Sequence, residues 1–339
     1  MTTTPAPVFD HLLCMTDERG TFEHARFGEA RPEHGYCTDD VARVLVVATR
    51  EPHPAPAVRH LAESSLRFLS DAQGLDGDYR NRRSRRGRWQ DRPTLEDCWG
   101  RSVWGLGTAA SHSDADWVRQ SATVQFERAA RRRSVWPRAM AFAALGAAEL
   151  LAVRPDHGVA RDLITDAADD MTSPGEDADW PWPEARLAYA NAVLPEAMIA
   201  AGAVLDRPSL LQDGLDLLAW LLVHETVGGH LSATPVGGAG AGDIRPGFDQ
   251  QPIEVAALAD ACARAAIVDG HRRWTDGVAA AVAWFLGEND GQHRMWDPQT
   301  GGGFDGLHAD GANLNQGTES TLALLSTLQH GRRLVTASP

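Results

Sequence analysis

Two kinds of helix-length segment alternate along the chain from residue 37 onward. Segments of the first kind are small, apolar and rich in alanine on most faces, which is typical of helices buried on both sides. They cover about 37–50, 96–110, 137–152, 187–202, 251–268 and 316–330. Segments of the second kind have one charged face and cover about 56–72, 115–131, 157–171, 207–224 and 272–287. Such amphipathic helices pack on one side and face water on the other.

This alternation predicts a repeated helical hairpin, and no run of β-branched residues at strand period interrupts it. Six buried helices backed by a second layer predict an all-α fold, an (α/α)6 toroid formed by a single domain of residues 1–339. Only five amphipathic helices follow residue 50. We therefore expect residues 1–34 to close the ring with a short helix around Pro7 to Met15, and residues 332–339 to form a flexible tail.

Composition narrows the classes of partner. Hydrophobic residues make up 43% of the chain, enough for a substantial core, and the formal net charge is −14. An acidic protein is poorly suited to nucleic acid or an anionic membrane, because both are polyanions. The run from Arg80 to Arg88 is dense enough in arginine to suggest a phosphate-binding patch, but charge runs are more often solvated loops. We interpret it as a loop bordering the cleft of the toroid.

Cysteines and terminal segments point to a reducing compartment. The four cysteines form no CxxC pair, so neither a metal knuckle nor a disulfide framework is indicated. The first residues lack a basic region followed by a sustained apolar run, and no later stretch is apolar for the length that a bilayer requires. We therefore expect a cytoplasmic protein without a membrane partner.

Polar and aromatic residues gather at the start of every buried helix. The six starts read GYCTDDVAR (35–43), LEDCWGRSVWG (95–105), VWPRAMAF (135–142), WPWPEARLAYANAVLP (180–195), GFDQQPIE (247–254) and LNQGTEST (314–321). In a toroid these first turns lie at one mouth of the barrel. Helix capping explains part of the pattern, for example at Thr38 and Thr94. The recurrence at six helices predicts a ligand cleft.

The carboxylates at this mouth suit glycoside hydrolysis, which needs one acid to protonate the leaving oxygen and a second to activate water or attack carbon. The catalytic candidates are Asp97, Glu184, Asp39, Asp40 and Glu254. We favour Asp97 with Glu184, because adjacent tryptophans and aliphatic walls would raise the pKa of one of them. Arg43 and Arg101 each follow a carboxylate pair by about one helical turn and would orient one of its members.

Other residues at the mouth are candidates for sugar binding. Aromatic rings offer flat faces to the CH groups of a pyranose, and side-chain amides both donate to and accept from hydroxyls. The substrate-binding candidates are Tyr36, Arg43, Glu96, Arg101, Arg138, Trp180, Trp182, Asn191, Gln250, Gln251, Asn315, Gln316 and Glu319. No HExxH motif and no phosphate-binding glycine loop with a following Lys-Thr occurs, so we predict neither a metal nor a cofactor.

At these helix starts the chain resembles a group of bacterial proteins related to the six-hairpin glycosidase superfamily and often described as associated with glycosyltransferases. The matching strings are HGYCTDDVAR, EDCWGR, WPRAMAF, WPWPEARLAYANAVLP, FDQQPIE and NQGTEST. The resemblance implies the (α/α)6 fold and a carbohydrate context linked to mannan or to sugar transfer. The sequence departs from the group's pattern at Ala190, where an aspartate is expected before the asparagine. If that aspartate is catalytic, activity here is lost or altered.

Three hypotheses for function follow. The leading one is a glycoside hydrolase acting on an oligosaccharide, with mannose-containing chains among the candidates. A sugar epimerase or isomerase of the same fold would need a proton-shuttling base, commonly histidine, and no helix start carries one apart from His34. A non-catalytic carbohydrate-binding partner of a glycosyltransferase would account for Ala190. A terpenoid cyclase is disfavoured, because DDVAR is not the DDxxD motif that holds magnesium and diphosphate.

Overall fold

The computed structural model describes residues 4–337 and the side chains of residues 4–334. The chain forms two compact units, and each is described by itself. The N-terminal unit comprises residues 12–171 and 200–207, and the C-terminal unit comprises residues 4–11, 172–199 and 208–337. The predicted single domain stays a prediction.

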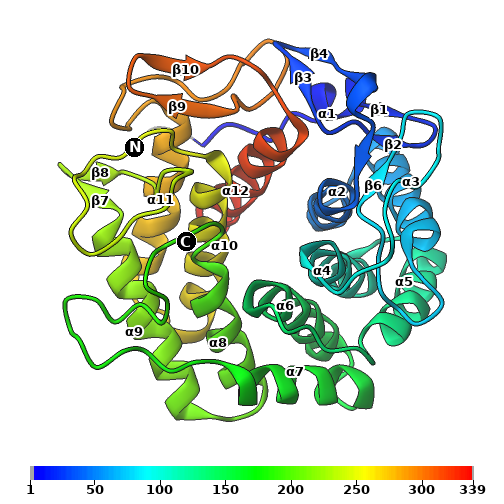
Figure 1. The fold of residues 1–339 in the computed structure, drawn as a ribbon, viewed down its shortest axis with the longest axis horizontal. Coiled ribbons are helices and arrows are strands. Elements are labelled where there is room, and N and C mark those ends of the chain that lie inside the picture. The colour runs from blue at the N-terminus through cyan, green and yellow to red at the C-terminus, as the bar shows by residue number, and fades with distance from the viewer. Residues whose placement is uncertain (1–3, 338–339) are drawn as a thin grey trace. The chain divides into compact units, whose positions relative to one another are not determined.

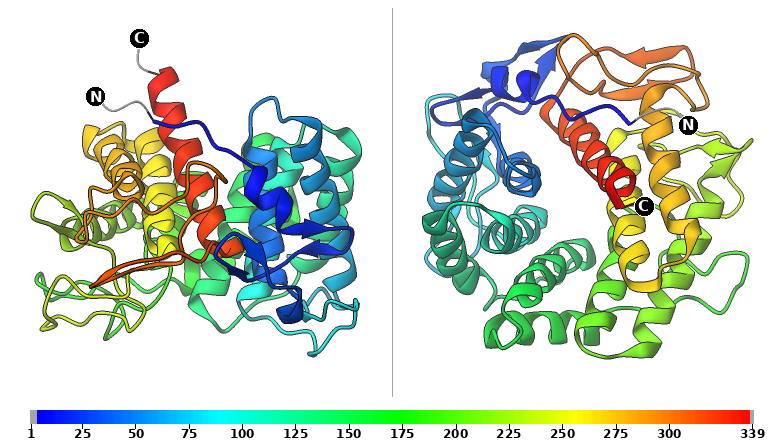
Figure 2. Two further views of the ribbon diagram at one scale, coloured as in Figure 1. Left: turned by 90° about the horizontal axis from the view of Figure 1, so that it is seen from above. Right: turned by 180° about the vertical axis from the view of Figure 1, so that it is seen from behind.

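The N-terminal unit consists of three helical hairpins (Figure 1). They are α2 (Thr38–Arg50) with α3 (Pro56–Ala72), α4 (Asp97–His112) with α5 (Asp116–Ala129), and α6 (Pro137–Val153) with α7 (Gly158–Asp170). Helix α4 packs against both α2 and α6, and each of these three helices is backed by its hairpin partner (Figures 1 and 2). Helix α2 is buried at every position except Asp39, whereas α3 buries one face only. The two kinds of helix predicted from the sequence are therefore found here as an inner and an outer row.

Glycines allow the inner helices to approach each other closely. A Cβ atom added at Gly107 of α4 would lie 2.0 Å from the carbonyl oxygen of Gly146 in α6, and one added at Gly100 would lie 2.3 Å from that of Ala139. A Cβ at Gly105 would lie 2.8 Å from the carbonyl oxygen of Ala42 in α2. Backbone atoms cannot yield as a flexible side chain can, so these positions exclude larger residues.

Short strand pairs connect the helices of this unit. After α1 (Asp10–Cys14), β1 (Thr16–Asp17) pairs with β2 (Gly20–Thr21), β3 (Ala25–Arg26) with β4 (Glu29–Ala30), and β5 (Tyr36–Cys37) with β6 (Arg82–Arg83); a 3-10 turn covers Pro32–His34. These strands are two residues long and are fixed by turn hydrogen bonds, so they leave no periodic pattern in the sequence. Because β5 directly precedes α2 in the chain, its pairing with β6 brings residues 82–83 close to the start of that helix (Figure 1).

The C-terminal unit is also mainly helical. Its helices are α9 (Pro208–His224), α10 (Pro252–Asp269), α11 (Arg272–Leu286), α12 (Thr318–Ala337) and the greater part of α8 (Val193–Val204). Helix α10 packs against α11 and α12, and also contacts α9. The strand pairs are β7 (Thr226–Val227) with β8 (His230–Leu231) and β9 (Gly306–His308) with β10 (Gly311–Asn313).

The helix bounds agree with the sequence except at two ends. Helix α8 begins at Val193 and not near residue 187. Ala190 takes a left-handed conformation (φ 46°), and a turn follows it in which the N–H of Val193 donates to the carbonyl of Ala190 at 3.1 Å. Helix α12 continues to Ala337, so most of the predicted tail, residues 332–339, is helical, and its last two residues lie outside the described part. The predicted short N-terminal helix is α1, and the described part of the predicted closing segment, residues 4–34, is divided between the two units.

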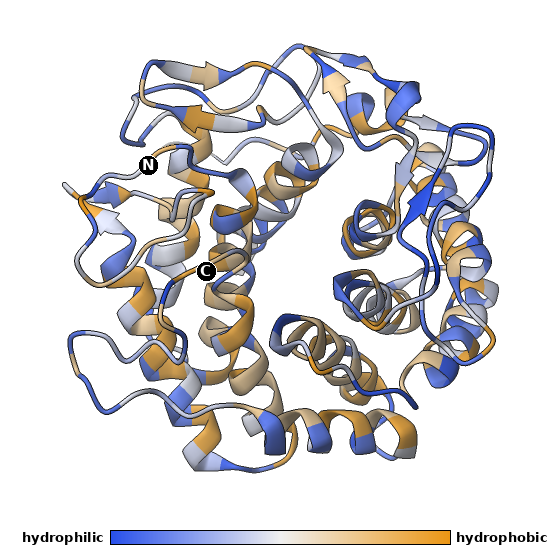
Figure 3. Cartoon of the chain, viewed as in Figure 1, coloured by the Kyte–Doolittle hydropathy of each residue, from blue (hydrophilic) through white to orange (hydrophobic). Residues whose placement is uncertain are grey.

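Apolar residues follow the helices, as Figure 3 shows, whereas loops such as the one around β6 are strongly hydrophilic. Over residues 4–337, no helix combines the length and the apolar character needed to cross a bilayer.

Candidate functional site

Two aspartates at the starts of neighbouring inner helices meet at one arginine. The carboxylate of Asp39, in the first turn of α2, lies 3.5 Å from Nε of Arg101, and that of Asp97, at the start of α4, lies 3.6 Å from Nη2 of the same side chain. Arg101 is buried, and its guanidinium lies over the ring of Phe142 in α6 at 4.5 Å. The side chains of Asp39 and Asp97 are 17% and 22% exposed, so both are partly open to solvent, although Oδ1 of Asp39 is itself buried.

The carboxyl group of Asp39 is largely withdrawn from solvent and has polar neighbours. Its Oδ2 accepts a hydrogen bond of 2.8 Å from the amide of Asn81, and its Oδ1 has no hydrogen-bond partner among the described residues. Burial raises the pKa of Asp39, and the positive charges of Arg101 and Arg43 only partly oppose this. A carboxyl group with a raised pKa beside a second carboxylate is the arrangement required of a general acid.

Asp40 has a different environment from its neighbour. It is buried, and Nη2 of Arg43 donates to its Oδ1 at 2.6 Å, one helical turn away. The orienting role predicted for Arg43 thus falls on Asp40, while Arg101 serves Asp97 as predicted by spacing and, in addition, Asp39. The link between Arg101 and Asp39 joins two helices and has no signal in local sequence spacing.

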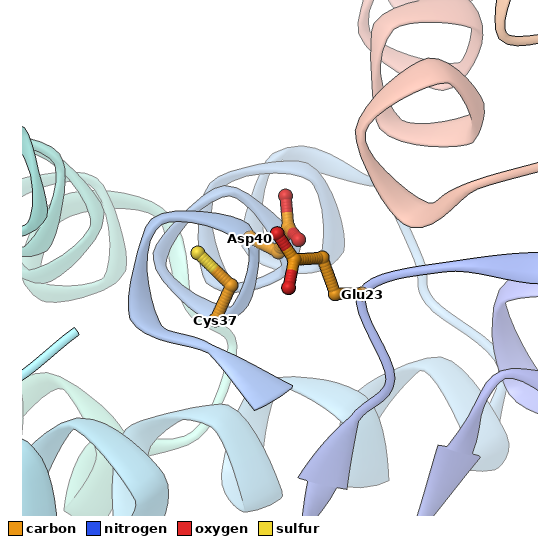
Figure 4. Close-up of side chains that lie close together, drawn as sticks. All are labelled: Glu23, Cys37 and Asp40. Atoms are coloured by element: carbon orange, nitrogen blue, oxygen red, sulfur yellow. The ribbon is translucent and has the colours of Figure 1, made fainter. Parts of the chain in front are cut away.

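One group of side chains, among those described, has ligand atoms close enough together to hold a metal ion. These are Glu23, Cys37 and Asp40, whose ligand atoms lie within 4.8 Å of one another (Figure 4). Both carboxylates already face arginines, Asp40 with Arg43 and Glu23 with Arg82. Burial raises the pKa of the Cys37 thiol well above its usual range, whereas metals bind the thiolate. The donor set fits an ion-pair network better than a metal site.

The other candidates of the N-terminal unit are two buried side chains and one exposed one. Tyr36 is buried, stacks on Phe22 at 4.9 Å, and donates its hydroxyl to Asp17 at 2.8 Å. Glu96 precedes α4 and is exposed, whereas Arg138, in the first turn of α6, is buried.

In the C-terminal unit, Glu254 organises the turn before α8. Its carboxylate accepts hydrogen bonds from the backbone N–H of Ala190, from the backbone N–H of Asn191 at 3.1 Å, and from Nδ2 of Asn191 at 2.9 Å. Glu254 is buried, and these donors fix the left-handed conformation of Ala190. The contacts match a structural role for Glu254 and Asn191, and the catalytic role of Glu254 stays a prediction.

We expect Glu254→Gln to lower the free energy of unfolding by about 2 kcal/mol, because the amide group would present donors to the backbone N–H groups of residues 190–191. Urea denaturation followed by circular dichroism measures this change. Unchanged stability together with lost turnover would contradict the structural role and favour a catalytic one.

Trp180, Trp182 and Glu184 belong to an aromatic cluster with two residues of α9. Trp182 donates its indole N–H to Glu184 at 3.3 Å and stacks near Trp220, and Trp220 stacks on His224 with 4.9 Å between ring centroids. Burial lowers the pKa of His224 to about 4, so its ring is neutral at pH 7. Trp220 and His224 were not among the sequence candidates, although their spacing of four residues places both on one face of α9.

The two glutamines at the start of α10 differ in burial. Gln250 is fully buried, donates to Asp290 at 2.6 Å and accepts from the indole of Trp284 at 3.2 Å. Gln251 is partly exposed. Beside them Asp249 faces His308 of β9 at 3.2 Å, and that imidazole is 45% exposed.

This His308–Asp249 pair is a functional candidate that the sequence did not suggest. Residue 308 reaches the start of α10 because β9 pairs with residue 250 through backbone hydrogen bonds between Gln250 and Leu307. A contact between residues so far apart in the chain has no local sequence pattern.

The candidates before α12 are held by nearby loops. Gln316 is buried, its carbonyl contacts the ring of His11 at 2.7 Å, and its side chain accepts from Thr300 at 2.7 Å. Asn315 and Glu319 are partly exposed. The structure thus places Tyr36, Asp39, Asp40, Arg43, Glu96, Asp97, Arg101 and Arg138 in the N-terminal unit, and the remaining candidates in the C-terminal unit.

Comparison with known proteins identifies the fold. No family model and no curated protein matches the chain. Among solved structures, the chain is similar to a cellobiose 2-epimerase from Bacillus thermoamylovorans (12% identity, TM-score 0.73, 96% of each chain) and to a sugar epimerase from a ruminal bacterium (12% identity, TM-score 0.72, 96% of this chain and 95% of that one). It is also similar to an inactive variant of an α-1,6-mannanase of Salegentibacter sp. in complex with α-1,6-mannotetrose (11% identity, TM-score 0.63, 96% of each chain).

The chain has the (α/α)6 fold. The solved structures to which it is similar, sugar epimerases and an α-1,6-mannanase among them, confirm the predicted fold class. Identities of 11–12% show the fold alone. The relation to the six-hairpin glycosidase superfamily and to the group defined by the GYCTDD, FDQQPIE and NQGTEST strings stays a prediction.

Proposed function

We propose that this protein is a glycoside hydrolase that cleaves an oligosaccharide with Asp39 and Asp97. The observation that carries the proposal is the convergence of these two carboxylates, from α2 and α4, on Arg101. Because both lie within 4 Å of one guanidinium group, their separation stays below the upper limit of about 9.5 Å found for the acid pairs of glycosidases. We take Asp39 in place of Glu184 as the partner of Asp97, since it shares Arg101 within one unit.

In the proposed reaction, protonated Asp39 donates its proton to the glycosidic oxygen as the bond between that oxygen and the anomeric carbon breaks. Asp97, as a carboxylate, can remove a proton from the water that attacks the anomeric carbon. Alternatively, Asp97 attacks the anomeric carbon itself, and water deprotonated by Asp39 then breaks the resulting ester bond and releases the Asp97 carboxylate. Arg101 stabilises the negative charge that Asp39 acquires when its proton leaves. The products are two shorter saccharides, and one water molecule is consumed.

The structural neighbours support a carbohydrate substrate. The mannanase of Salegentibacter sp. was inactivated by replacing two consecutive aspartates, and its complexes hold α-1,6-mannotetrose and α-1,6-mannotriose. In this chain, consecutive acidic residues stand at the starts of two inner helices, at 39–40 and at 96–97. Mannose-containing oligosaccharides are therefore the first substrates to test.

A sugar epimerase is the second candidate, and the His308–Asp249 pair favours it. A partly exposed imidazole paired with a carboxylate can take up and return a proton next to a carbonyl group. Cellobiose 2-epimerases are among the structural neighbours. A third reading, a non-catalytic binding partner of a glycosyltransferase, rests on Ala190 alone.

One experiment separates these functions. The purified protein is incubated in D2O with manno- and gluco-oligosaccharides, and the products are resolved by chromatography and mass spectrometry. Shorter products without deuterium on carbon support hydrolysis, and deuterium at C2 of an uncleaved reducing sugar supports epimerisation. If the saccharide is neither cleaved nor deuterated but binds saturably in calorimetry, the hydrolase hypothesis is wrong. The remaining function would then be that of a non-catalytic binding partner.

We expect the decrease of kcat/KM at high pH to follow the deprotonation of Asp39. As the general acid, Asp39 must be protonated, so kcat/KM falls as pH rises through its raised pKa. Arg101 lowers that pKa, so Arg101→Gln should move the alkaline limb to higher pH. The measurement is the pH profile of kcat/KM for both proteins. If kcat/KM decreases at the same pH in both proteins, a group other than Asp39 supplies the proton.

A further inference from the structure

A hairpin loop in the N-terminal unit concentrates positive charge beside the proposed acid. This arginine hairpin, residues 82–92, begins at β6 and turns at Ser84–Gly87, where the N–H of Gly87 donates to the carbonyl of Ser84 at 2.8 Å and the N–H of Ser84 donates to that of Arg88 at 2.9 Å. Gly87 has a φ of +80°, which the tight turn requires. The loop is therefore a defined turn with a fixed tip.

The base of the hairpin is fixed by packing and charge. The guanidinium of Arg83 lies over the rings of Phe68 and Trp89, at 5.4 and 5.3 Å from their centroids, and faces Asp71 at 3.5 Å. Arg82 is paired with Glu23. These two arginines are therefore used within the protein.

The remaining arginines of the hairpin are not neutralised. Arg85, Arg86, Arg88 and Arg92 are exposed, and none has an ion-pair partner among the described residues. Asp91, the acid within the hairpin, uses its Oδ2 to accept the backbone N–H groups of Asn81 and Arg82, at 2.6 and 3.1 Å. Four like charges within eight residues repel one another, and a bound anion would relieve that repulsion.

The net negative charge of the chain is not divided equally between the two units. The N-terminal unit has 24 arginines and 25 acidic residues, whereas the C-terminal unit has 8 arginines and 21 acidic residues. The excess of negative charge thus resides in the C-terminal unit. The field at the hairpin is set mainly by its own arginines, because exposed charges are screened beyond about 10 Å at moderate salt.

The hairpin is tied directly to the proposed acid. Asn81, the residue before it, donates its side-chain amide to Asp39 at 2.8 Å, and the carboxamide oxygen of Asn81 accepts the N–H of Thr38 at 3.1 Å. Arg85 is the fourth residue after Asn81, so the tip lies at most about 14 Å from Asn81 along the chain. This places unpaired guanidinium groups within a few sugar units of the bond that Asp39 would protonate.

We propose that the arginine hairpin binds the negatively charged group of an acidic saccharide, so that the substrate of this protein is an oligosaccharide carrying a phosphate or a carboxylate. The inference rests on the proposed function for the position of the saccharide, and it names the substrate class. Guanidinium groups bind both anions through paired hydrogen bonds. The charged sugar lies away from the cleaved bond and fixes which bond reaches Asp39 and Asp97.

Calorimetric titration tests this without requiring turnover. The probes are mannotetraose, the same tetrasaccharide phosphorylated at one 6-hydroxyl, a tetrasaccharide ending in glucuronate, and inorganic phosphate. The proteins are the natural chain, Arg85→Gln/Arg86→Gln, and the control Arg272→Gln/Arg273→Gln, which removes two consecutive exposed arginines of α11. Circular dichroism establishes that each variant is folded.

We expect one of the two acidic tetrasaccharides to bind at least about tenfold more tightly than mannotetraose, and the phosphate and glucuronate arms identify which anion is preferred. This preference should disappear in Arg85→Gln/Arg86→Gln and persist in the control. Equal affinity for neutral and acidic saccharides, binding of none of them, a preference that survives in the hairpin variant, or inorganic phosphate binding as tightly as the phosphorylated tetrasaccharide would overturn the proposal. Cleavage of a neutral saccharide without a charge preference would refute this inference alone, whereas a charge preference without cleavage would refute the hydrolase alone.

Discussion

Asp97→Asn is expected to lower kcat/KM for oligosaccharide hydrolysis by about 10³-fold, while the dissociation constant for the substrate changes little. The amide cannot attack the anomeric carbon or accept a proton from water, yet it keeps the shape of the carboxylate. Asp39→Asn should have a similar effect with natural substrates, because it removes the proton donor. Stopped assays with separated products give the rates, and calorimetry gives the affinities.

A synthetic glycoside with a good leaving group refines the assignment. Such a substrate needs little protonation, so Asp39→Asn should recover much of its activity with it, whereas Asp97→Asn should not. Asp76→Asn is the matched control, since Asp76 is an exposed aspartate of the same unit. If both active-site variants kept full activity while the control did too, the Asp39–Asp97 pair would not be the catalytic one, and Glu184 would return as the leading partner to examine.

Gly107→Ala should lower the free energy of unfolding by about 3 kcal/mol or prevent folding. The added Cβ would lie 2.0 Å from the carbonyl oxygen of Gly146, so the backbones of α4 and α6 would have to move apart at this position. Gly158→Ala is the control, because a Cβ there meets no atom within 4 Å and residue 158 begins α7. Alanine at that position should be neutral or slightly stabilising.

Urea denaturation followed by circular dichroism measures both changes. A loss at Gly107 no larger than the change at Gly158 would mean that the inner helices do not pack through backbone contact. A large loss would also explain why the first kind of segment is rich in glycine and alanine, since small residues permit the close approach of α2, α4 and α6.

The electrostatic setting of the site could be predicted only in part. Sequence spacing gave the pairing of Arg101 with Asp97, since residues four apart lie on one face of a helix. It did not give the contact of Arg101 with Asp39, which decides the proposed catalytic pair. Likewise, FDQQPIE drew attention to the start of α10, but the pairing of Asp249 with His308 depends on β9 lying beside residue 250.

Burial also changes the role that can be assigned to several residues predicted to bind a sugar or to act in catalysis. Gln250, Gln316 and Glu254 have the polar side chains expected of a sugar-binding cleft, yet each is buried and bonded to groups of the protein. In a sequence, a polar residue that organises a loop looks the same as one that binds a ligand. Only the number and direction of its hydrogen bonds separate the two.

The sequence by itself determined the buried and amphipathic sets of helices and their bounds, except at the start of α8 and the end of α12, because helical periodicity is a local property of the chain. It also determined that polar groups gather at the starts of the buried helices. The tertiary structure decided which of these groups meet: Asp39 with Asp97 at Arg101, and Glu254 with the turn before α8. Those contacts join residues many turns apart, and their geometry depends on how closely whole helices pack.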